Sequence, residues 1–343
     1  MTAYSTTAPL AHVIVVAAIL IAGMYMAAEI ANPILFAFVL VVITAPVVSW
    51  LEEKGLPRKF AVPAVVGLIA GLGLLLAGLI SLSLLELQEG LPAYQEAIRQ
   101  QLVLLEPWFA EWGIDTAIPL PPQIGEGTAF VPPIGEILAE LGTLVAAFLV
   151  LVLATIFMFG EFPGVGLRIR HALGSGAALA VAFEHFRCRL SGYAAVKIKT
   201  GLVTGAAVTV LLLALGVQAP LLWGLLIFLF SLIPFIGLPI ASLPPAGVAL
   251  LQYGLLGGLA VLAGITVIDL VTRTYLFPGA IDRISDLSNA VIILSVFFWT
   301  FVLGVPGLFL AVPLTMFAKM GLESTEETQW MAVLLRPPPV QDG

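Results

Sequence analysis

The chain has 343 residues, of which 60% are hydrophobic and only 10% are charged. Soluble domains carry about 25% charged residues, so this composition excludes a soluble globule of ordinary design. The net charge of −7 offers no basic surface for nucleic acid. The single cysteine, Cys188, excludes an intrachain disulfide framework and any cysteine-based zinc site.

Apolar runs long enough to cross a bilayer begin near the N-terminus. A transmembrane helix needs about 20 apolar residues. The first run lacks the cationic start and the cleavage site of a signal peptide, so we expect a retained helix. Two further stretches, residues 200–268 and 287–318, contain no Asp, Glu, Lys, Arg or His. Conventional spans are predicted at residues 9–28, 33–51, 61–85, 141–160 and 200–217, with a sixth beginning near Leu255.

The basic residues predict the orientation, because Lys and Arg accumulate in short cytoplasmic loops. The segment between the third and fourth runs has Arg99 as its only basic residue and is rich in Glu, so we expect it outside. Both termini are then cytoplasmic. The cytoplasmic loops are marked by Lys54, Arg58 and Lys59 after the second run, and by Arg168, Arg170, Arg187, Arg189, Lys197 and Lys199 after the fourth.

The outer segment carries an amphipathic pattern. Apolar side chains recur there every three or four residues, which places them on one face of a helix. Packing against the protein's own bundle or the bilayer surface is one interpretation, and a subunit contact is the other. A Pro- and Gly-rich connecting loop is expected over residues 118–136. The apolar positions are Leu91, Tyr94, Ile98, Leu102, Leu105, Phe109 and Trp112.

Prolines interrupt the apolar stretch of residues 220–253, which is too long for one untilted span. We predict two half-helices that meet at a turn over residues 233–239 and that enter and leave on the outer side. This arrangement delivers Arg273 and Arg283 to the cytoplasm, whereas a single broken crossing would place both outside. The prolines expected to break the helix are Pro234, Pro239, Pro244 and Pro245.

Residues 288–320 repeat this plan from the inner side, with a break at residues 303–307 and Lys319 near the end. The two halves then form an inverted repeat, whose broken helices make the substrate site in many secondary transporters. Irregular backbone at membrane depth can bind a polar solute through its free amide and carbonyl groups. A kinked helix without a ligand is the alternative. The candidate substrate-binding residues, in which Gly237-Leu238-Pro239 matches Gly304-Val305-Pro306, are Pro234, Phe235, Gly237, Pro239, Gly304, Pro306 and Gly307.

Ionisable residues at membrane depth are candidates for coupling or gating. Asp269 and Arg273 are four residues apart, so they can pair on one helix face; an ion pair that only anchors the helix is the alternative. Lys197 is a third candidate, and we expect Lys197 and Lys199 to snorkel. A charged surface that faces solvent or lipid headgroups is expected on the cytoplasmic helix that carries Glu184, His185, Arg187 and Arg189, and a functional site there is the alternative.

Motifs of known enzymes are missing from the sequence. His12, His171 and His185 lack the H-E-x-x-H spacing, and there is no G-x-S-x-G elbow and no P-loop. We therefore expect no catalytic residue, no metal and no cofactor. A channel lined by the broken helices remains an alternative to a carrier.

Two segments carry a family resemblance: "LLWGLLIFLFSLIPFIGLPIASLPPAGVAL" and "VIILSVFFWTFVLGVPGLFLAVPLTMFAKMGLE". They resemble the signature regions of the autoinducer-2 exporter family, and the resemblance extends over nearly the whole chain through "FMFGEFP" and "SGYAAVKIKTGLVTG". It implies a multi-pass protein of the bacterial inner membrane that exports small molecules as a homo-oligomer, with a pentamer as the leading expectation. Some relatives resemble cation/proton antiporters. The chain departs from the family pattern at Phe235, Thr274 and Phe277, which makes the expected pocket less polar.

The predicted fold class is an all-α membrane protein with six conventional spans and two re-entrant hairpins. We expect a secondary transporter that exports a small polar molecule, such as an autoinducer-2-like quorum-sensing signal, by alternating access. A cation/proton antiporter and a channel are the alternatives. The expected partners are the small-molecule substrate, membrane lipids and further copies of the chain. Six segments are expected along the chain. They are the first three transmembrane helices (1–87), the outer amphipathic helix and loop (88–140), the fourth helix with a cytoplasmic helical segment (141–199), the fifth helix with the outer hairpin (200–253), the seventh-helix region with the inner hairpin (254–322) and a cytoplasmic tail (323–343).

Overall fold

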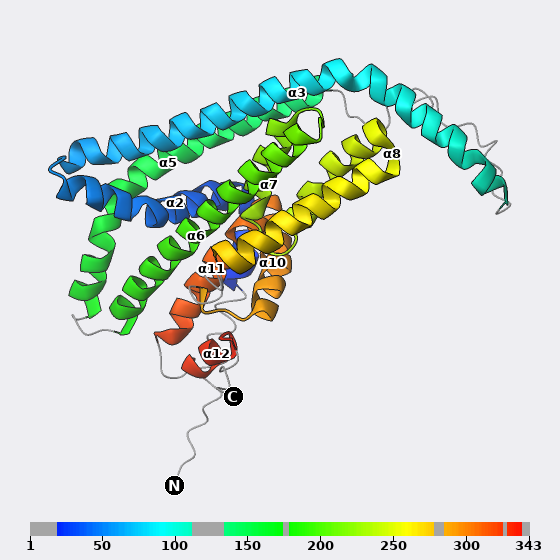
Figure 1. Ribbon diagram of the computed structural model, residues 1–343. Coiled ribbons are helices and arrows are strands. Elements are labelled where there is room, and N and C mark those ends of the chain that lie inside the picture. Colours follow the sequence, from blue (N-terminus) through cyan, green and yellow to red (C-terminus); the bar gives the residue numbers. More distant parts are fainter. Residues whose placement is uncertain (1–18, 112–133, 174–177, 278–284, 325–327, 338–343) are drawn as a thin grey trace, which may run out of the picture. The chain divides into compact units, whose positions relative to one another are not determined.

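The computed structural model describes residues 19–111, 134–173, 178–277, 285–324 and 328–337. These residues form helices and connecting turns, with no strand among them (Figure 1). The elements are α2 (Ala28–Glu53), α3 (Arg58–Glu111), α5 (Ile134–Leu173), α6 (Ala178–Ala214), α7 (Pro220–Ser231), α8 (Gly237–Val271), the π-helical η2 (Thr272–Leu276), α10 (Asn289–Leu303), α11 (Val305–Glu323) and α12 (Gln329–Leu334).

Within the described residues, six helices are long and apolar enough to cross a membrane. The all-α membrane fold expected from the composition is therefore confirmed. Of the first expected span, residues 19–26 are helical, a turn at Ala27 separates them from α2, and residues 9–18 lie outside the described residues. The six ranges are Ala28–Glu53, Arg58–Leu85, Ala139–Glu161, Val181–Ala214, Gly237–Leu276 and Val305–Glu323.

Two helices extend well beyond the apolar runs that predict them. α3 has 54 residues and runs without interruption from the third span through the amphipathic segment to Glu111. The helix predicted for that segment is confirmed over residues 91–111, whereas Trp112 and most of the expected loop lie outside the described residues. α6 likewise joins the charged segment before residue 200 to the fifth span in one helix of 37 residues.

The chain divides into two compact units. Unit 1 comprises Met1–Ala70, Ala147–Ile198 and Gly279–Gly343, and unit 2 comprises Gly71–Ala146 and Lys199–Pro278. Each unit contains one pair of helices joined by a short turn, at the place where the sequence predicts a hairpin. The pair is α10 and α11 in unit 1, and α7 and α8 in unit 2.

Small residues bring α6 and α7 close together in unit 2. A Cβ at Gly205 would lie 2.7 Å from the carbonyl oxygen of Gly224, and a Cβ at Gly201 would overlap Ser231 Oγ. Gly201 and Gly205 form a G-x-x-x-G pattern, which lets helix backbones approach closely in membranes. The unit is completed by a buried apolar cluster that includes Leu84, Val208, Leu212, Trp223, Ile227, Leu238, Ala249, Val261 and Ile265.

The helix break predicted in unit 2 is present, but fewer prolines cause it than expected. α7 ends at Ser231 and α8 begins at Gly237, so Pro234 lies in the break. Pro239 lies in the first turn of α8, where its missing N–H costs little. The prediction that Pro244 and Pro245 break the helix is wrong: both lie inside α8. Membrane helices tolerate such prolines because neighbouring groups satisfy the freed carbonyls.

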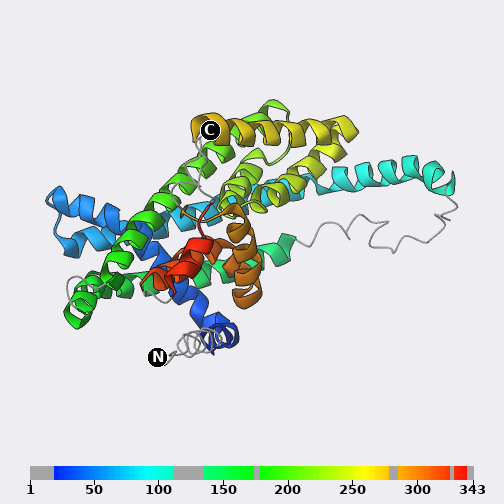
Figure 2. The same cartoon turned by 90° about the horizontal axis from the view of Figure 1, so that it is seen from below.

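A second reversal divides α8 itself. Gly254 has φ 73° and ψ −170°, a conformation outside the helical region that glycine adopts readily. A Cβ at Gly257 would lie 2.7 Å from the carbonyl oxygen of Ala249, so the two halves of α8 pack against each other beside this turn. Both views show the halves, in yellow, lying side by side (Figures 1 and 2). The helix predicted to begin near Leu255 is therefore confirmed.

Unit 1 is held together by two apolar clusters that share α2. One cluster joins α6 to the α10–α11 pair and includes Val42, Phe186, Leu190, Tyr193, Ile292, Val312 and Met316. The other joins α2 to the start of α3 and to α5 and comprises Val41, Val48, Ala61, Val65, Val66 and Phe159.

Candidate functional site

The tip of the α7–α8 hairpin holds the four candidate residues of unit 2. Phe235 has a positive φ of 59° and leaves 41% of its surface exposed. Pro239 is also exposed, whereas Pro234 and Gly237 are buried. A Cβ at Gly237 would overlap the carbonyl oxygen of Phe230 on α7, so only glycine fits where the two helices begin to separate.

The tip of the α10–α11 hairpin holds the three candidates of unit 1. Gly304 is exposed and forms the break, with φ 71° and ψ −152°. Pro306 occupies the first turn of α11, and Gly307 is buried. A Cβ at Gly307 would overlap the carbonyl oxygen of Trp299 on α10. The Trp299 indole also donates to Thr315 Oγ1 at 3.0 Å, which ties the two helices together further from the tip.

In each tip, one glycine lies against a backbone carbonyl of the preceding helix. The unit 1 glycine that corresponds to Gly237 in this contact is not the one that the G-x-P alignment pairs with it. The G-x-P alignment pairs Gly237 with Gly304. By contrast, the residue whose missing side chain admits a carbonyl of the preceding helix is Gly237 in unit 2 and Gly307 in unit 1. The positive-φ residues are Phe235 and Gly304. The structure therefore brings the candidates together as two separate tips, one in each unit.

Asn32 on α2 is a contact of the unit 1 tip that sequence reasoning missed. Its side-chain Nδ2 donates to the carbonyl oxygen of Leu303, the last residue of α10, at 3.2 Å. A lone amide in the apolar run "IANPILFAFVL" was the available signal. Its partner is 271 residues away in the chain, so no local pattern could identify the contact.

The pairing predicted for Asp269 and Arg273 is present. Arg273 Nε donates to Asp269 Oδ1 at 2.7 Å, and the side chains are 44% and 21% exposed respectively. Lys197 differs from expectation: only 6% of it is exposed, whereas Lys199 is exposed. Lys197 is therefore packed within the protein and does not snorkel, whereas snorkelling of Lys199 stays a prediction.

A cluster of charges closes the base of the unit 1 hairpin, and sequence reasoning missed this as well. Lys319 on α11 is only 2% exposed and donates from Nζ to the Asp286 carboxylate at 2.9 Å. Arg189 on α6 reaches the same carboxylate oxygen at 3.0 Å. Arg336 lies 3.8 Å from it and pairs with Glu323 at 3.1 Å. Arg189, expected on a solvated surface, is therefore part of an ion cluster.

The cluster keeps Asp286 ionised. Burial by itself would raise the pKa of Asp286, but the Lys319 ammonium that donates to it, with Arg189 and Arg336, holds this pKa below its ordinary value. The backbone of Asp286 is left-handed, with φ 50°. Asp and Asn tolerate this conformation better than most residues, which is a second reason for an Asp here.

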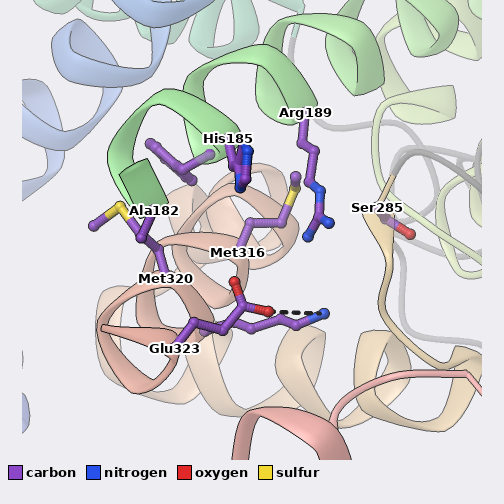
Figure 3. Close-up of a pocket in the computed structure, with 9 residues that line it drawn as sticks. Ala182, His185, Arg189, Ser285, Met316, Met320 and Glu323 are labelled. Atoms are coloured by element: carbon purple, nitrogen blue, oxygen red, sulfur yellow. Dashed lines mark ion pairs between the residues drawn. The ribbon is translucent and has the colours of Figure 1, made fainter. Parts of the chain in front are cut away.

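A small cavity lies beside this cluster (Figure 3). Arg189 extends from α6 toward α11, from which Met316, Met320 and Glu323 project. The space is about 10 Å³, enough for a single water molecule and too small for a solute. The cluster therefore acts as a structural clamp. No group of three or more His, Cys, Asp or Glu side chains that could hold a metal ion occurs among the described residues.

An apolar chain whose helices are interrupted at two hairpin tips has the features of a membrane transporter. The family model described as AI-2E family transporter matches residues 14–327, and the chain belongs to this family. AI-2 transport protein TqsA of Escherichia coli (strain K12) is 32% identical over 317 residues, which cover 92% of each chain. A "Putative transport protein" of Haemophilus influenzae is 32% identical, covering 92% of this chain and 93% of its own. "Putative transport protein YhhT" of E. coli K12 is 28% identical, covering 93% and 91%.

Proposed function

We propose that the protein is a secondary transporter that exports a small polar molecule across the bacterial inner membrane by alternating access, with an autoinducer-2-like signal as its cargo. The observation that carries this proposal is the pair of interrupted helices, each with an exposed break and a glycine that admits a neighbouring carbonyl. Such breaks expose backbone polar groups, which membrane proteins tolerate only where protein or water surrounds them.

In this proposal both hairpins are re-entrant, α7–α8 from the outside and α10–α11 from the inside, and both termini are cytoplasmic. The lengths support it: α7 has 12 residues and α10 has 15, so each is shorter than the roughly 20 residues of a full crossing. The candidate residues at the two tips are the proposed binding groups. A homo-oligomer is proposed from the family resemblance alone.

The cargo assignment is supported by the similarity to AI-2 transport protein TqsA. Phe235 and Phe277 add apolar surface where the family pattern has polar groups, so we expect fewer side-chain hydrogen bonds to the cargo in this chain. Proton or cation exchange is a second candidate function, because the ion pair of Asp269 and Arg273 lies inside an apolar range long enough to span the membrane.

The experiment that tests the function measures autoinducer-2 inside and outside cells that lack their own exporter. Expression of the wild-type protein should lower the internal concentration and raise the external one. Gly237→Leu and Gly304→Leu variants, at matched membrane expression, should lose this effect. An unchanged internal concentration would reject autoinducer-2 as the cargo, and cation/proton exchange in vesicles would be measured next.

A further inference from the structure

The amide of Asn32 has its orientation fixed by the hairpin tip of unit 1. The carbonyl oxygen of Leu303 can only accept a hydrogen bond, so the Asn32 group that faces it must be the NH₂ group. The usual ambiguity between the nitrogen and oxygen of an amide is thereby removed. Asn32 Oδ1 consequently points away from the Leu303 carbonyl.

Asn32 Oδ1 is buried, and no donor reaches it from any residue that the structure describes. A buried acceptor left without a donor costs about 1–3 kcal/mol. The surrounding α2 sequence is apolar, so this side chain is an isolated polar group rather than part of a larger network. An acceptor kept in this state beside a helix break is open to a donor that the described residues do not supply.

The hairpin tip offers further acceptors and few donors. Gly304 ends α10, and in an unbroken helix the Val302 carbonyl would accept from residue 306, which is proline and has no N–H. The last carbonyls of a helix also carry its partial negative charge. The nearest charged side chain along α2 is Glu29, which is acidic and exposed. These groups disfavour an anion and favour a hydrogen-bond donor.

We propose that Asn32 Oδ1 accepts a hydrogen bond from a hydroxyl group of the transported solute, so that Asn32 selects neutral, hydroxyl-bearing cargo at the α10–α11 tip. This inference rests on the proposed export function and deepens it. Nδ2 holds the tip through Leu303, and Oδ1 contacts the cargo, so one side chain both positions the break and contributes to specificity.

Transport kinetics separate these two roles. In proteoliposomes with autoinducer-2 as the cargo, Asn32→Leu removes donor and acceptor and keeps the same branching of the side chain. Loss of one uncharged hydrogen bond should raise KM about tenfold. Asn32→Asp loses the donor to Leu303 but keeps acceptor oxygens, so its KM should rise less than that of Asn32→Leu. An unchanged KM in Asn32→Leu, or an equal rise in both variants, would overturn the inference.

A labelling experiment tests the inference without assuming the cargo. Cys188 is the only cysteine and is exposed, so Cys188→Ser gives a cysteine-free background. Asn32→Cys in that background should react with a water-soluble maleimide. Ala37→Cys, at a wholly buried position of the same helix, should not. Failure to label the Asn32→Cys thiol would reject an aqueous cargo path at Asn32, even in a protein that exports autoinducer-2.

A second thiol distinguishes failure of the cargo assignment from failure of the inference. If the wild type does not transport autoinducer-2, the proposed cargo is wrong. Ribose, xylitol and glycerol then serve as hydroxyl-bearing probes at millimolar concentration. Val305→Cys in the cysteine-free background places a thiol at an exposed position of the tip and keeps Asn32. Protection of this thiol by at least one probe but not by sodium chloride, and its loss on Asn32→Leu, supports the inference. No protection by any probe, or protection that survives Asn32→Leu, overturns it.

Discussion

Lys319 donates to Asp286 twice, to its backbone carbonyl oxygen at 2.5 Å and to its carboxylate at 2.9 Å. This double contact joins the end of α11 to the residue that precedes α10, so it closes the hairpin at the end opposite to Gly304. Arg189 adds α6 and Arg336 adds the C-terminal segment to the same carboxylate. Ser288, the N-cap of α10, donates from its backbone to the Leu335 carbonyl at 2.9 Å. The base is therefore fixed by four parts of unit 1.

Removal of the Asp286 charge should destabilise the protein. Asp286→Asn keeps a residue that tolerates the left-handed backbone but leaves the buried Lys319 with only Glu323, 3.9 Å away, as its counter-ion. We expect a loss of about 1–3 kcal/mol in the free energy of unfolding, below that of a fully buried pair because the Asp286 side chain is 24% exposed. Thermal unfolding of the purified protein in detergent measures this. Arg187→Gln, which removes an exposed pair with Glu184, is the control and should change little.

The cluster also predicts an acid-sensitive stability. The pKa of Asp286 is lower in the folded protein than in the unfolded chain, where it is about 3.9. Its contribution is therefore complete above about pH 4 and is lost as the pH falls through the folded-state pKa. The melting temperature of the wild type should decline in that acid window, with a smaller decline for Asp286→Asn. Parallel curves for the two proteins would exclude Asp286 as the source.

The close approaches at the two tips predict that added methyl groups are harmful there. Gly237→Ala and Gly307→Ala each place a Cβ into a backbone carbonyl of the preceding helix, so the hairpins must shift. The expected cost is about 1–3 kcal/mol, together with loss of export. Gly247→Ala on α8 and Gly321→Ala on α11 are matched controls because nothing lies within 4 Å of a Cβ at either position. Normal export by the tip variants would contradict the assigned role.

The G-x-x-x-G contact of α6 provides a separate test of unit 2. Gly205→Ala meets the carbonyl oxygen of Gly224 and the side chain of Phe228, so α7 must move away from α6. We expect a lower melting temperature at unchanged membrane insertion. Gly78→Ala has open space around its Cβ and should be neutral or stabilising by about 0.5–1 kcal/mol. Equal melting temperatures for the two variants would show that α7 does not depend on this contact.

The coupling hypothesis for Asp269 requires a functional readout. Asp269→Asn removes the titratable carboxylate, and if that group carries protons, export should lose its dependence on pH while the protein still inserts. Flux into vesicles at several external pH values measures this dependence. Glu161→Gln, which removes a carboxylate from an exposed pair with Arg168, is the control. Retention of the wild-type pH profile by Asp269→Asn would leave the ion pair with an anchoring role.

Sequence periodicity predicted the helices well and their ends poorly. The apolar runs marked the spans because a bilayer requires about 20 consecutive apolar residues. Hydrophobic periodicity could not show that α3 and α6 continue through polar segments, because a helix does not have to end where the apolar residues end. Proline was a reliable signal only at Pro234, because Pro239, Pro244 and Pro245 each find a tolerated place in α8.

The sequence by itself determined the class of the protein, the all-helical fold, the two interrupted helices and the pairing of Asp269 with Arg273, because each depends on composition or on spacing within one element. Tertiary structure decided which residues meet across elements: Asn32 with Leu303, Asp286 with Lys319 and Arg189, and Gly307 with the carbonyl of Trp299. Those contacts depend on how helices pack, and packing brings together residues that no periodicity connects.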